Sequence, residues 1–224
     1  MQALGLCGIF MEGAAPASSV QTALSQIEKS TAARRLILRS DERISTVPVV
    51  CQGWAATAEY LRNGQRQILS FVLPGDLISA GLLFKDAPRH NVEAVTRVYY
   101  RDFDRAALRE AMRARPDILE AFLASFANET ERIAEMVVDL GRRSAQQRVA
   151  RLILTLMERL EKNDMVRDQA FNFPLRQAHI ADALGLTAPY VNQVLNAFRA
   201  RRLIRFEKRL LTILDAEELR GMVN

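Results

Sequence analysis

The hydrophobic period of this chain changes near Pro116, and this change constrains the fold more than any other feature of the sequence. Before Pro116, turn residues divide residues 36–100 into short runs of β-branched and aromatic side chains. After it, apolar residues recur at steps of three, four or seven from Leu119 to Leu140. Side chains on one face of a strand repeat every two residues, and those on one face of a helix about every 3.6. We therefore expect an α+β protein whose β-rich N-terminal part precedes its helices.

The pair Asn63-Gly64 is the clearest turn signal in the β-rich part. Asn-Gly accepts positive φ at both central positions of a type I′ turn, and it lies between strand-like runs at residues 57–61 and 67–73. A second turn signal follows at residues 74–76, and residues 92–100 read as one further strand. Residues 1–115 are therefore predicted to form an antiparallel β domain.

The stripe after Pro116 predicts a long amphipathic helix over residues 116–140, which Gly141 is expected to end. Such a stripe can pack on its own β domain, or it can pair with a second copy of the chain in a coiled coil. We prefer the second interpretation, which makes the protein a homodimer. The expected interface comprises Leu119, Phe122, Phe126, Ile133, Met136, Val137 and Leu140.

Residues 141–224 predict a helix-turn-helix domain. Ser144 and Gln147 have capping-box spacing ahead of a helix that carries Val149, Leu152, Ile153, Leu156 and Leu160, and a polar loop follows at residues 161–169. Ile180, Ala181 and Leu184 then mark a short helix, Gly185 a turn, and Thr187 the N-cap of a second helix to about Arg201. Residues 203–206 and 210–214 resemble the two strands of a wing.

The charge is concentrated in this C-terminal part. Residues 141–224 contain 15 basic and 9 acidic side chains, whereas residues 1–140 contain 16 and 17. A basic region of this kind is typical of proteins that bind a polyanion such as DNA, although a solvated basic face gives the same count.

The second helix of the motif has one polar face. Asn and Gln side chains can pair with the N6 and N7 edge of adenine, so we expect this face to read bases in double-stranded DNA. The alternative is an ordinary surface helix. The expected base-reading residues are Pro189, Tyr190, Asn192, Gln193 and Asn196. The expected phosphate contacts, which position the protein without specifying sequence, are Arg176, Gln177, His179, Thr187, Arg199, Arg201, Arg202, Lys208 and Arg209.

Several short motifs, in this order and spacing, make the chain resemble the Crp/Fnr transcription regulators. They are Gly53-Trp54-Ala55, residues 63–69 leading to Leu73-Pro74-Gly75-Asp76, Gly141-Arg142-Arg143, and residues 180–187 followed by Tyr190-Val191-Asn192-Gln193. The resemblance implies an N-terminal jelly-roll sensor domain with a cupin-like roll, a dimerisation helix, and a C-terminal winged helix-turn-helix whose second helix enters the major groove. RNA polymerase and a small-molecule effector are the further partners it suggests.

The chain departs from the cAMP-binding members of that family. Where they resemble one another in a ribose-binding Glu and a phosphate-binding Arg-Ser or Arg-Thr pair, this sequence has Ala80 and Pro88-Arg89. A buried phosphate needs a matched cation, so we expect no ordinary cAMP binding. Ala188, Pro189 and Gln193 also replace Arg and Glu residues that many members carry in the reading helix, which predicts a different target sequence.

Composition bounds the remaining classes. Cys7 and Cys51 are the two cysteines, too few for a disulfide framework or a four-cysteine metal site, which fits a reducing compartment. Residues 1–11 lack the features of a signal peptide, and no apolar run is long enough to span a membrane, so we expect a cytoplasmic protein. His90 and His179 are the two histidines, and we expect neither to bind metal or act in catalysis. No cofactor is expected.

Two other functions compete with transcription regulation. A cupin-like metal enzyme would need several imidazoles or carboxylates that converge, and the sequence has one histidine in the β domain. A winged-helix domain can also serve only as a protein-interaction module. Salt-dependent binding to duplex DNA separates both from a DNA-binding regulator.

Overall fold

A computed structural model describes residues 27–223, which form two compact units. The first unit contains residues 27–59 and 69–131, and the second contains residues 60–68 and 132–223. Cys7 and the stretch at residues 1–11, on which two expectations above depend, lie outside the described residues.

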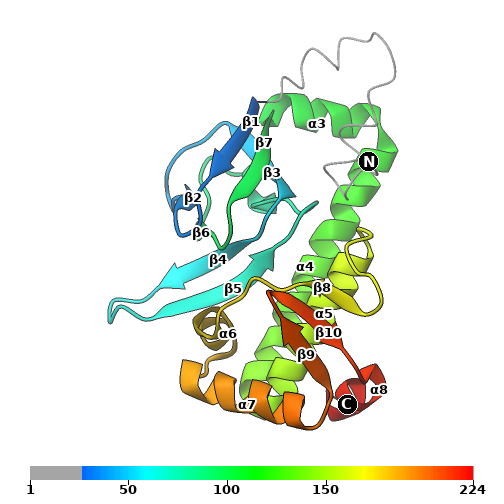
Figure 1. The fold of residues 1–224 in the computed structure, drawn as a ribbon. Coiled ribbons are helices and arrows are strands. Elements are labelled where there is room, and N and C mark those ends of the chain that lie inside the picture. Colours follow the sequence, from blue (N-terminus) through cyan, green and yellow to red (C-terminus); the bar gives the residue numbers. More distant parts are fainter. Residues whose placement is uncertain (1–26, 224) are drawn as a thin grey trace. The chain divides into compact units, whose positions relative to one another are not determined.

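The first unit is built on two antiparallel sheets (Figure 1). One has the strand order β1-β7-β3 and the other β2-β6-β4-β5. The strands are β1 (Ile27–Thr31), β2 (Leu36–Leu38), β3 (Thr46–Gln52), β4 (Ala55–Tyr60), β5 (Arg66–Val72), β6 (Asn91–Ala94) and β7 (Val98–Asp104). Inward-facing residues of both sheets, including Val49, Phe103, Ala55 and Val92, form one buried core. The predicted antiparallel β domain is therefore confirmed, although the single strand predicted at 92–100 is two strands, β6 and β7.

The hairpin predicted at Asn63-Gly64 is present, but its predicted turn type is wrong. Among these two residues, only Gly64 has positive φ, at 83°. The backbone N–H of Gly64 donates to Leu61 O at 2.9 Å, and that of Leu61 donates to Gln65 O at 2.8 Å. The loop is thus a four-residue turn, 61–64, whose last residue is the left-handed Gly64. Asn63 also donates its side-chain amide to Gln65, which favours this wider loop.

Gly53 shows why the Gly53-Trp54-Ala55 motif begins with glycine. Its φ is +87°, and a Cβ placed there would lie 2.1 Å from the carbonyl oxygen of Arg97. No other residue fits without moving the backbone. The close approach allows Trp54 N–H to donate to Thr96 Oγ1 at 2.9 Å, and the Trp54 side chain is 1% exposed.

Two short helices complete the β domain, and the sequence reasoning predicted neither. They are η1 (Ala80–Leu83), a 3₁₀ turn, and α3 (Arg105–Ala114). Asp104 caps α3 by accepting the backbone N–H of Ala107 at 2.9 Å. The helix buries Leu108, Ala111 and Met112 in the same core, a pattern too short to stand out in the sequence.

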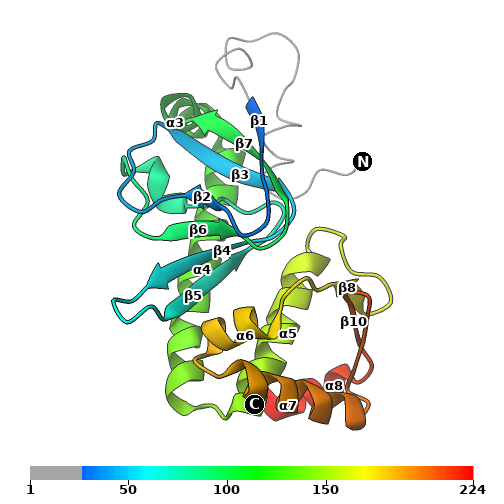
Figure 2. The same ribbon diagram turned by 60° about the vertical axis from the view of Figure 1, so that its left-hand side comes forward.

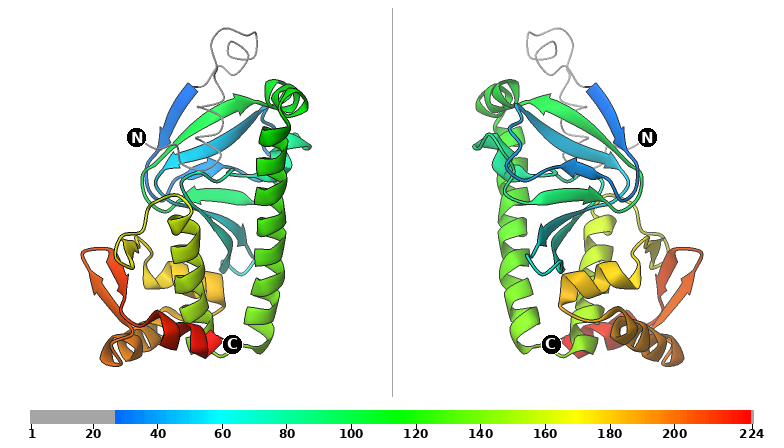
Figure 3. Two further views of the ribbon diagram at one scale, coloured as in Figure 1. Left: turned by 90° about the vertical axis from the view of Figure 1, so that its right-hand side faces the viewer. Right: turned by 90° about the vertical axis from the view of Figure 1, so that its left-hand side faces the viewer.

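Helix α4 (Pro116–Arg142) is one unbroken helix, seen in green in Figure 3. Gly141 lies inside it, so the expectation that this glycine ends the helix at residue 140 is wrong by two residues. Glycine is tolerated in a last helical turn, and the helix stops only where the capping box of the next helix begins.

The apolar stripe of α4 divides into a buried part and an exposed part. Ile118 and Phe122 are 3% and 4% exposed and belong to the core of the first unit. Phe122 is therefore not part of the exposed stripe to which the sequence assigned it, and Leu123, 52% exposed, takes its place. Met136, also expected at the interface, is half-buried, and Val138, 48% exposed, lies outside the spacing of three, four and seven. We call the exposed residues that keep this spacing the α4 seam: Leu119, Leu123, Phe126, Ile133, Val137 and Leu140.

The second unit is a small helical domain with a three-stranded sheet (Figure 2). Its elements are α5 (Ala145–Glu161), β8 (Ala170–Asn172), α6 (Gln177–Leu184), α7 (Ala188–Ala200), β9 (Ile204–Glu207), β10 (Leu210–Ile213) and α8 (Ala216–Val223). The capping box predicted at Ser144 and Gln147 is present. The sheet order is β8-β10-β9, so the predicted two-stranded wing has a third strand.

The core of this unit joins α5 to the helix-turn-helix. Val149, Ile153 and Leu156 of α5 are buried, as are Val191 and Phe198 of α7. Helix α8, which was not predicted, buries Leu219 and packs on α5. The hairpin tip at residues 60–68 also belongs to this unit, where Arg66 forms an ion pair with Asp182 at 2.7 Å.

Candidate nucleic-acid interface

The turn between α6 and α7 has the local chemistry that the sequence predicted. Gly185 ends α6 in the left-handed conformation with φ 62°, where a side chain would be strained. Thr187 caps α7 by accepting the backbone N–H of Tyr190 at 3.4 Å. Pro189 occupies the first turn of α7, where no backbone N–H is needed. These residues fix the start of α7 and the direction in which its side chains point.

Helix α7 has one buried and one exposed face. Val191, Val194 and Phe198 are buried, whereas Pro189, Tyr190, Gln193 and Asn196 are exposed. The structure therefore places four of the five expected base-reading residues on one open surface. The fifth, Asn192, is half-buried, and its Oδ1 accepts a hydrogen bond from Gln177 Nε2 at 2.8 Å.

The amides of this face differ in how far they are already engaged. Asn196 Oδ1 accepts from Arg199 Nη1 at 3.0 Å, so the group of Asn196 that remains to donate is its amide nitrogen. Gln193 makes no side-chain hydrogen bond within the described part of the chain, so both its donor and its acceptor are available. Gln193 is consequently the side chain best placed for a two-bond contact with a base edge.

The wing presents two cations on a tight turn. Strands β9 and β10 are joined by Lys208 and Arg209, which have φ values of 45° and 70°. Two residues of positive φ between paired strands form a type I′ turn. Both side chains are exposed, so the turn holds two positive charges at the end of the wing.

The other expected phosphate contacts are unequally available. Arg176, Gln177 and Arg202 are exposed, and Arg199 lies with its guanidinium 5.7 Å from the ring centre of Phe206. Arg201 is exposed but forms an ion pair with Glu218, so part of its charge is already neutralised.

Thr187 and His179 serve as local helix caps. The Thr187 hydroxyl accepts the backbone N–H of Tyr190 and can still donate its proton. His179 Nδ1 lies 3.1 Å from the backbone N–H of Arg176 and accepts it. The Thr187 hydroxyl can thus still hydrogen-bond an anion.

A cavity of about 480 Å³ lies between α6, α7 and the wing strands. Phe173, Ile180, Leu195 and Phe206 are among the apolar residues that line it. Its polar lining groups are the side chains of Arg176, Gln177 and Arg199, all expected phosphate contacts. The arrangement offers cations beside an apolar hollow, which suits the alternation of phosphate and sugar along a DNA strand.

The β domain has less polar chemistry to offer. His90 Nδ1 lies 2.8 Å from Glu59 Oε2, and the Cys51 thiol is half-buried with Val49 O as a distant partner at 3.9 Å. No group of three or more His, Cys, Asp or Glu side chains that could hold a metal ion occurs among residues 27–223. Ala80 lies in η1, Pro88 is buried and Arg89 is exposed.

The sequence reasoning missed two sets of residues. One is Leu123, which the strict alternation of steps of four and three from Leu119 to Phe126 could have shown. The other is a group of charged side chains where α4 meets α5. The i,i+4 spacing of Asp139 and Arg143 could have indicated one ion pair, but the pairing of Arg151 with Glu135 and Asp139 joins two different helices.

A β roll joined by a long helix to a winged helix-turn-helix defines a class of two-domain regulators that bind DNA. Comparison with known proteins agrees. Residues 28–115 match the cyclic nucleotide-binding domain family, and residues 147–222 match the Crp-like helix-turn-helix domain family. The chain belongs to the Crp/Fnr family of transcription regulators.

Individual relatives cover most of the chain. It is 30% identical over 167 residues to the nitrogen fixation regulation protein FixK of Rhizobium meliloti, covering 73% of this chain and 72% of FixK. It is 26% identical over 202 residues to the transcriptional activator protein FnrL of Cereibacter sphaeroides, covering 88% and 81%. The structure of FixK2 from Bradyrhizobium japonicum superposes with a TM-score of 0.79 at 26% identity, covering 90% of this chain and 98% of FixK2.

Within residues 27–223, none of the helices combines the length and the apolar character that crossing a membrane requires.

Proposed function

We propose that this protein is a homodimeric regulator that binds an inverted-repeat operator in double-stranded DNA through α7. The observation that carries the proposal is the exposed face of α7, where Gln193 has both hydrogen-bonding groups available next to Pro189 and Asn196. A face of this kind has no role in the core of its own domain. It has the donors and acceptors that a base edge in the major groove needs.

Recognition would divide between the helix and its surroundings. Gln193 would pair with the N6 and N7 edge of an adenine, and Asn196 would donate to a neighbouring acceptor. Pro189 and Tyr190 would supply apolar contact, for example with a thymine methyl group. Arg176, Gln177 and Arg199 on one side and Lys208 and Arg209 on the other would hold the phosphates and so fix the position of the helix.

The α4 seam supports the homodimer. Its six apolar residues are spaced by four, three, seven, four and three, which follows a period of 3.5 and keeps one face toward a partner helix in a coiled coil. Leu123, Phe126 and Val137 are 52%, 53% and 66% exposed, and each would be covered by the same helix of a second copy. Two-fold symmetry would then place two copies of α7 in successive major grooves, roughly 34 Å apart.

We propose that cAMP is not the effector. Among the relatives is a CRP-like cAMP-activated global transcriptional regulator of Mycobacterium tuberculosis, 28% identical over 174 residues. In this chain the side chains of Ala80 and Pro88 have no group that can bind a ribose or a phosphate, and Arg89 stands where the Ser or Thr of the pair would be. Isothermal titration calorimetry should show no micromolar binding of cAMP, and cAMP should leave the affinity for DNA unchanged within threefold. Micromolar binding, or a tenfold gain in affinity, would contradict this part of the proposal.

Salt dependence tests the proposed function directly. Fluorescence anisotropy should show that affinity for a labelled duplex falls steeply between 50 and 200 mM salt, because phosphate contacts release counterions. A matched titration with the Arg176→Ala, Arg199→Ala double variant should give a slope smaller by about two units per subunit. A flat salt response, or no binding to duplex DNA, would instead favour a protein-interaction module.

RNA polymerase and an unidentified small effector are the further partners we propose.

A further inference from the structure

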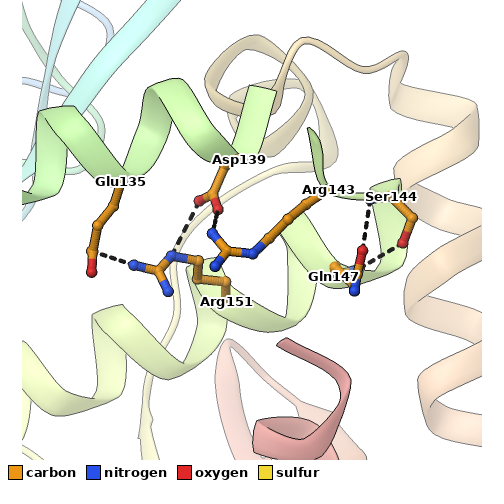
Figure 4. Close-up of polar contacts among 6 residues, drawn as sticks. All are labelled: Glu135, Asp139, Arg143, Ser144, Gln147 and Arg151. Carbon is orange, nitrogen blue, oxygen red and sulfur yellow. Dashed lines mark hydrogen bonds and ion pairs between the residues drawn. The ribbon is translucent and has the colours of Figure 1, made fainter. Parts of the chain in front are cut away.

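Charged side chains join α4 to α5 at the corner between the two helices (Figure 4). Arg151 of α5 forms ion pairs with two carboxylates of α4, Glu135 and Asp139, the second at 3.3 Å from Arg151 Nε. Arg143, just past the end of α4, forms an ion pair with the other oxygen of Asp139. We call Glu135, Asp139, Arg143 and Arg151 the corner network.

The last turns of α4 contribute no buried apolar side chain beside the corner network. In the last turns of α4, over residues 132–142, Asp139 alone is buried, at 8% exposed. Among residues 27–223, Asp102 is the other buried charged residue. The side chains of Arg151 and Asp139 are 18% and 12% exposed, so their pairing is less screened by solvent than that of a surface ion pair.

The backbone at this corner would otherwise be free to turn. Ser144 interrupts the helical path with φ −63° and ψ 162°, and its capping box with Gln147 starts α5 afresh (Figure 4). A cap fixes where a helix begins but not the direction in which it leaves the preceding helix. The corner network supplies contacts that join the two helices across this break.

Further contacts extend from α5 to the reading helix. Arg148 Nη1 of α5 donates to Leu184 O at 2.7 Å, at the end of α6. Gly185 follows directly and leads through Thr187 into α7. The direction in which α5 leaves α4 therefore determines where the reading face of α7 lies relative to the end of α4.

We propose that the corner network sets the spacing between operator half-sites. This inference rests on the proposed function, because it takes α4 as the dimer helix and α7 as the reading helix. If the two α4 helices of a dimer are fixed by their seam, the angle at each corner determines the distance and rotation between the two α7 helices. The corner network is then a specificity determinant that touches no DNA.

The test measures spacing preference rather than affinity alone. The full-length protein is titrated by anisotropy against operators with identical half-sites whose centres are moved apart or together by one and two base pairs. Each base pair moves the half-sites by about 3.4 Å and roughly a tenth of a helical turn. The wild-type protein should bind one spacing at least tenfold more tightly than its neighbours.

Removing the corner network should flatten this preference. For Arg151→Met, which keeps the length of the side chain, we expect the ratio between the best spacing and its neighbours to fall at least fivefold. Glu135→Gln removes one exposed carboxylate with little risk to folding and should lower the ratio at least twofold. The half-site sequence preferred by each variant should not change. Arg151→Lys should recover part of the ratio.

Arg142→Met is the matched control. Arg142 is exposed and forms no ion pair within the described residues, so this variant loses the same charge at the same corner. It should keep the wild-type ratio. If Glu135→Gln and Arg151→Met weaken binding at all spacings by one common factor, the corner network only stabilises the fold, and the inference is wrong.

Failure of the inference is distinct from failure of the proposed function. A wild-type protein that binds paired half-sites with a spacing preference that its corner variants share would overturn the inference alone. A wild-type protein that binds no duplex DNA, or binds as a monomer, would overturn the proposed function and this inference with it.

Discussion

At the scale of single residues, the wing turn combines an unfavourable backbone conformation with the phosphate contacts that we propose for Lys208 and Arg209. Lys208 and Arg209 have positive φ, although Asn and Gly are the residues that favour a type I′ turn. An ordinary L-residue in the left-handed region is destabilised by about 1 kcal/mol. The same conformation holds two exposed cations at the end of the wing, where a phosphate backbone would lie.

Lys208→Asn should therefore separate stability from binding. Asn tolerates positive φ better than Lys, so chemical denaturation should give a free energy of unfolding that is higher by about 0.5 kcal/mol. The affinity for duplex DNA should fall at all sequences alike, with a salt slope smaller by about one unit per subunit. A variant that bound DNA as tightly as the wild type would remove Lys208 from the phosphate contacts.

Substitutions of Gln193 and Arg209 should have different effects on DNA binding: the first on sequence preference, the second on affinity for all sequences. Gln193→Ala should lose about 1 to 3 kcal/mol on the preferred site and relax the preference at one base pair of each half-site, because a base contact carries sequence information. Arg209→Ala should weaken binding to every sequence and leave the preferred sequence unchanged. These expectations are checked by selecting bound sequences with each variant. If Arg209→Ala changed the selected sequence and Gln193→Ala did not, the wing would be the reading element instead of α7.

At the scale of elements, one face of α4 packs in the β core, and we propose that another face pairs with a second copy of the chain. Ile118 and Phe122 belong to the core of the first unit, whereas the residues of the α4 seam are exposed. The seam keeps its spacing of four and three through position 130, which is Thr130, whose hydroxyl donates to Phe126 O at 3.0 Å. A polar residue satisfied within its own helix can occupy a coiled-coil position at a modest cost in stability.

Phe126→Glu should break the dimer. A carboxylate at the centre of the seam would be buried opposite its own copy, which should weaken dimerisation about 100-fold or more. Sedimentation velocity measures the change. Asn128→Glu is the control, since it adds the same charge at an exposed position of the same helix away from the seam. A folded Phe126→Glu variant that remained fully dimeric would exclude the seam as the interface.

The sequence predicted elements best where a local rule decides the structure. The capping box at Ser144, the left-handed Gly185 and the Thr187 cap are each set by two or three neighbouring residues, and all three are confirmed. Helix and strand boundaries that depend on tertiary contacts are harder to predict from the sequence. Gly141 is helical although it was expected to end α4. Strand β8 forms by pairing with β10, which is distant in the sequence, and Phe122 is buried by residues of the β core.

In the candidate interface, too, the sequence predicts what a local pattern determines and misses what long-range contacts determine. The polar face of α7 follows from its helical period, so the sequence alone places Pro189, Gln193 and Asn196 on it. The engagement of Asn192 by Gln177 and of Arg201 by Glu218 could not be predicted, because each pair joins residues 15 or more positions apart. In the corner network, the ion pairs that Arg151 makes with Glu135 and Asp139 join two helices and could not be predicted either, whereas Asp139 and Arg143 are only four positions apart.

At the scale of the whole molecule, the charge asymmetry of the sequence now has a location. Of the 15 basic residues after position 140, Arg176, Arg199, Arg202, Lys208 and Arg209 are exposed around α7 and the wing. Arg143, Arg148 and Arg151 are instead half-buried and engaged within the second unit. A basic composition therefore overstates the charge available to DNA, and the salt slope should reflect the exposed set.

The central claim is that two copies of α7 read an inverted repeat. The most direct test is to select bound sequences from a pool of random duplexes with the purified full-length protein. We expect enriched sequences that contain two inverted copies of one short motif, with centres about 10 base pairs, roughly 34 Å, apart. Enrichment of a single asymmetric motif, of direct repeats, or of no motif at all would contradict it.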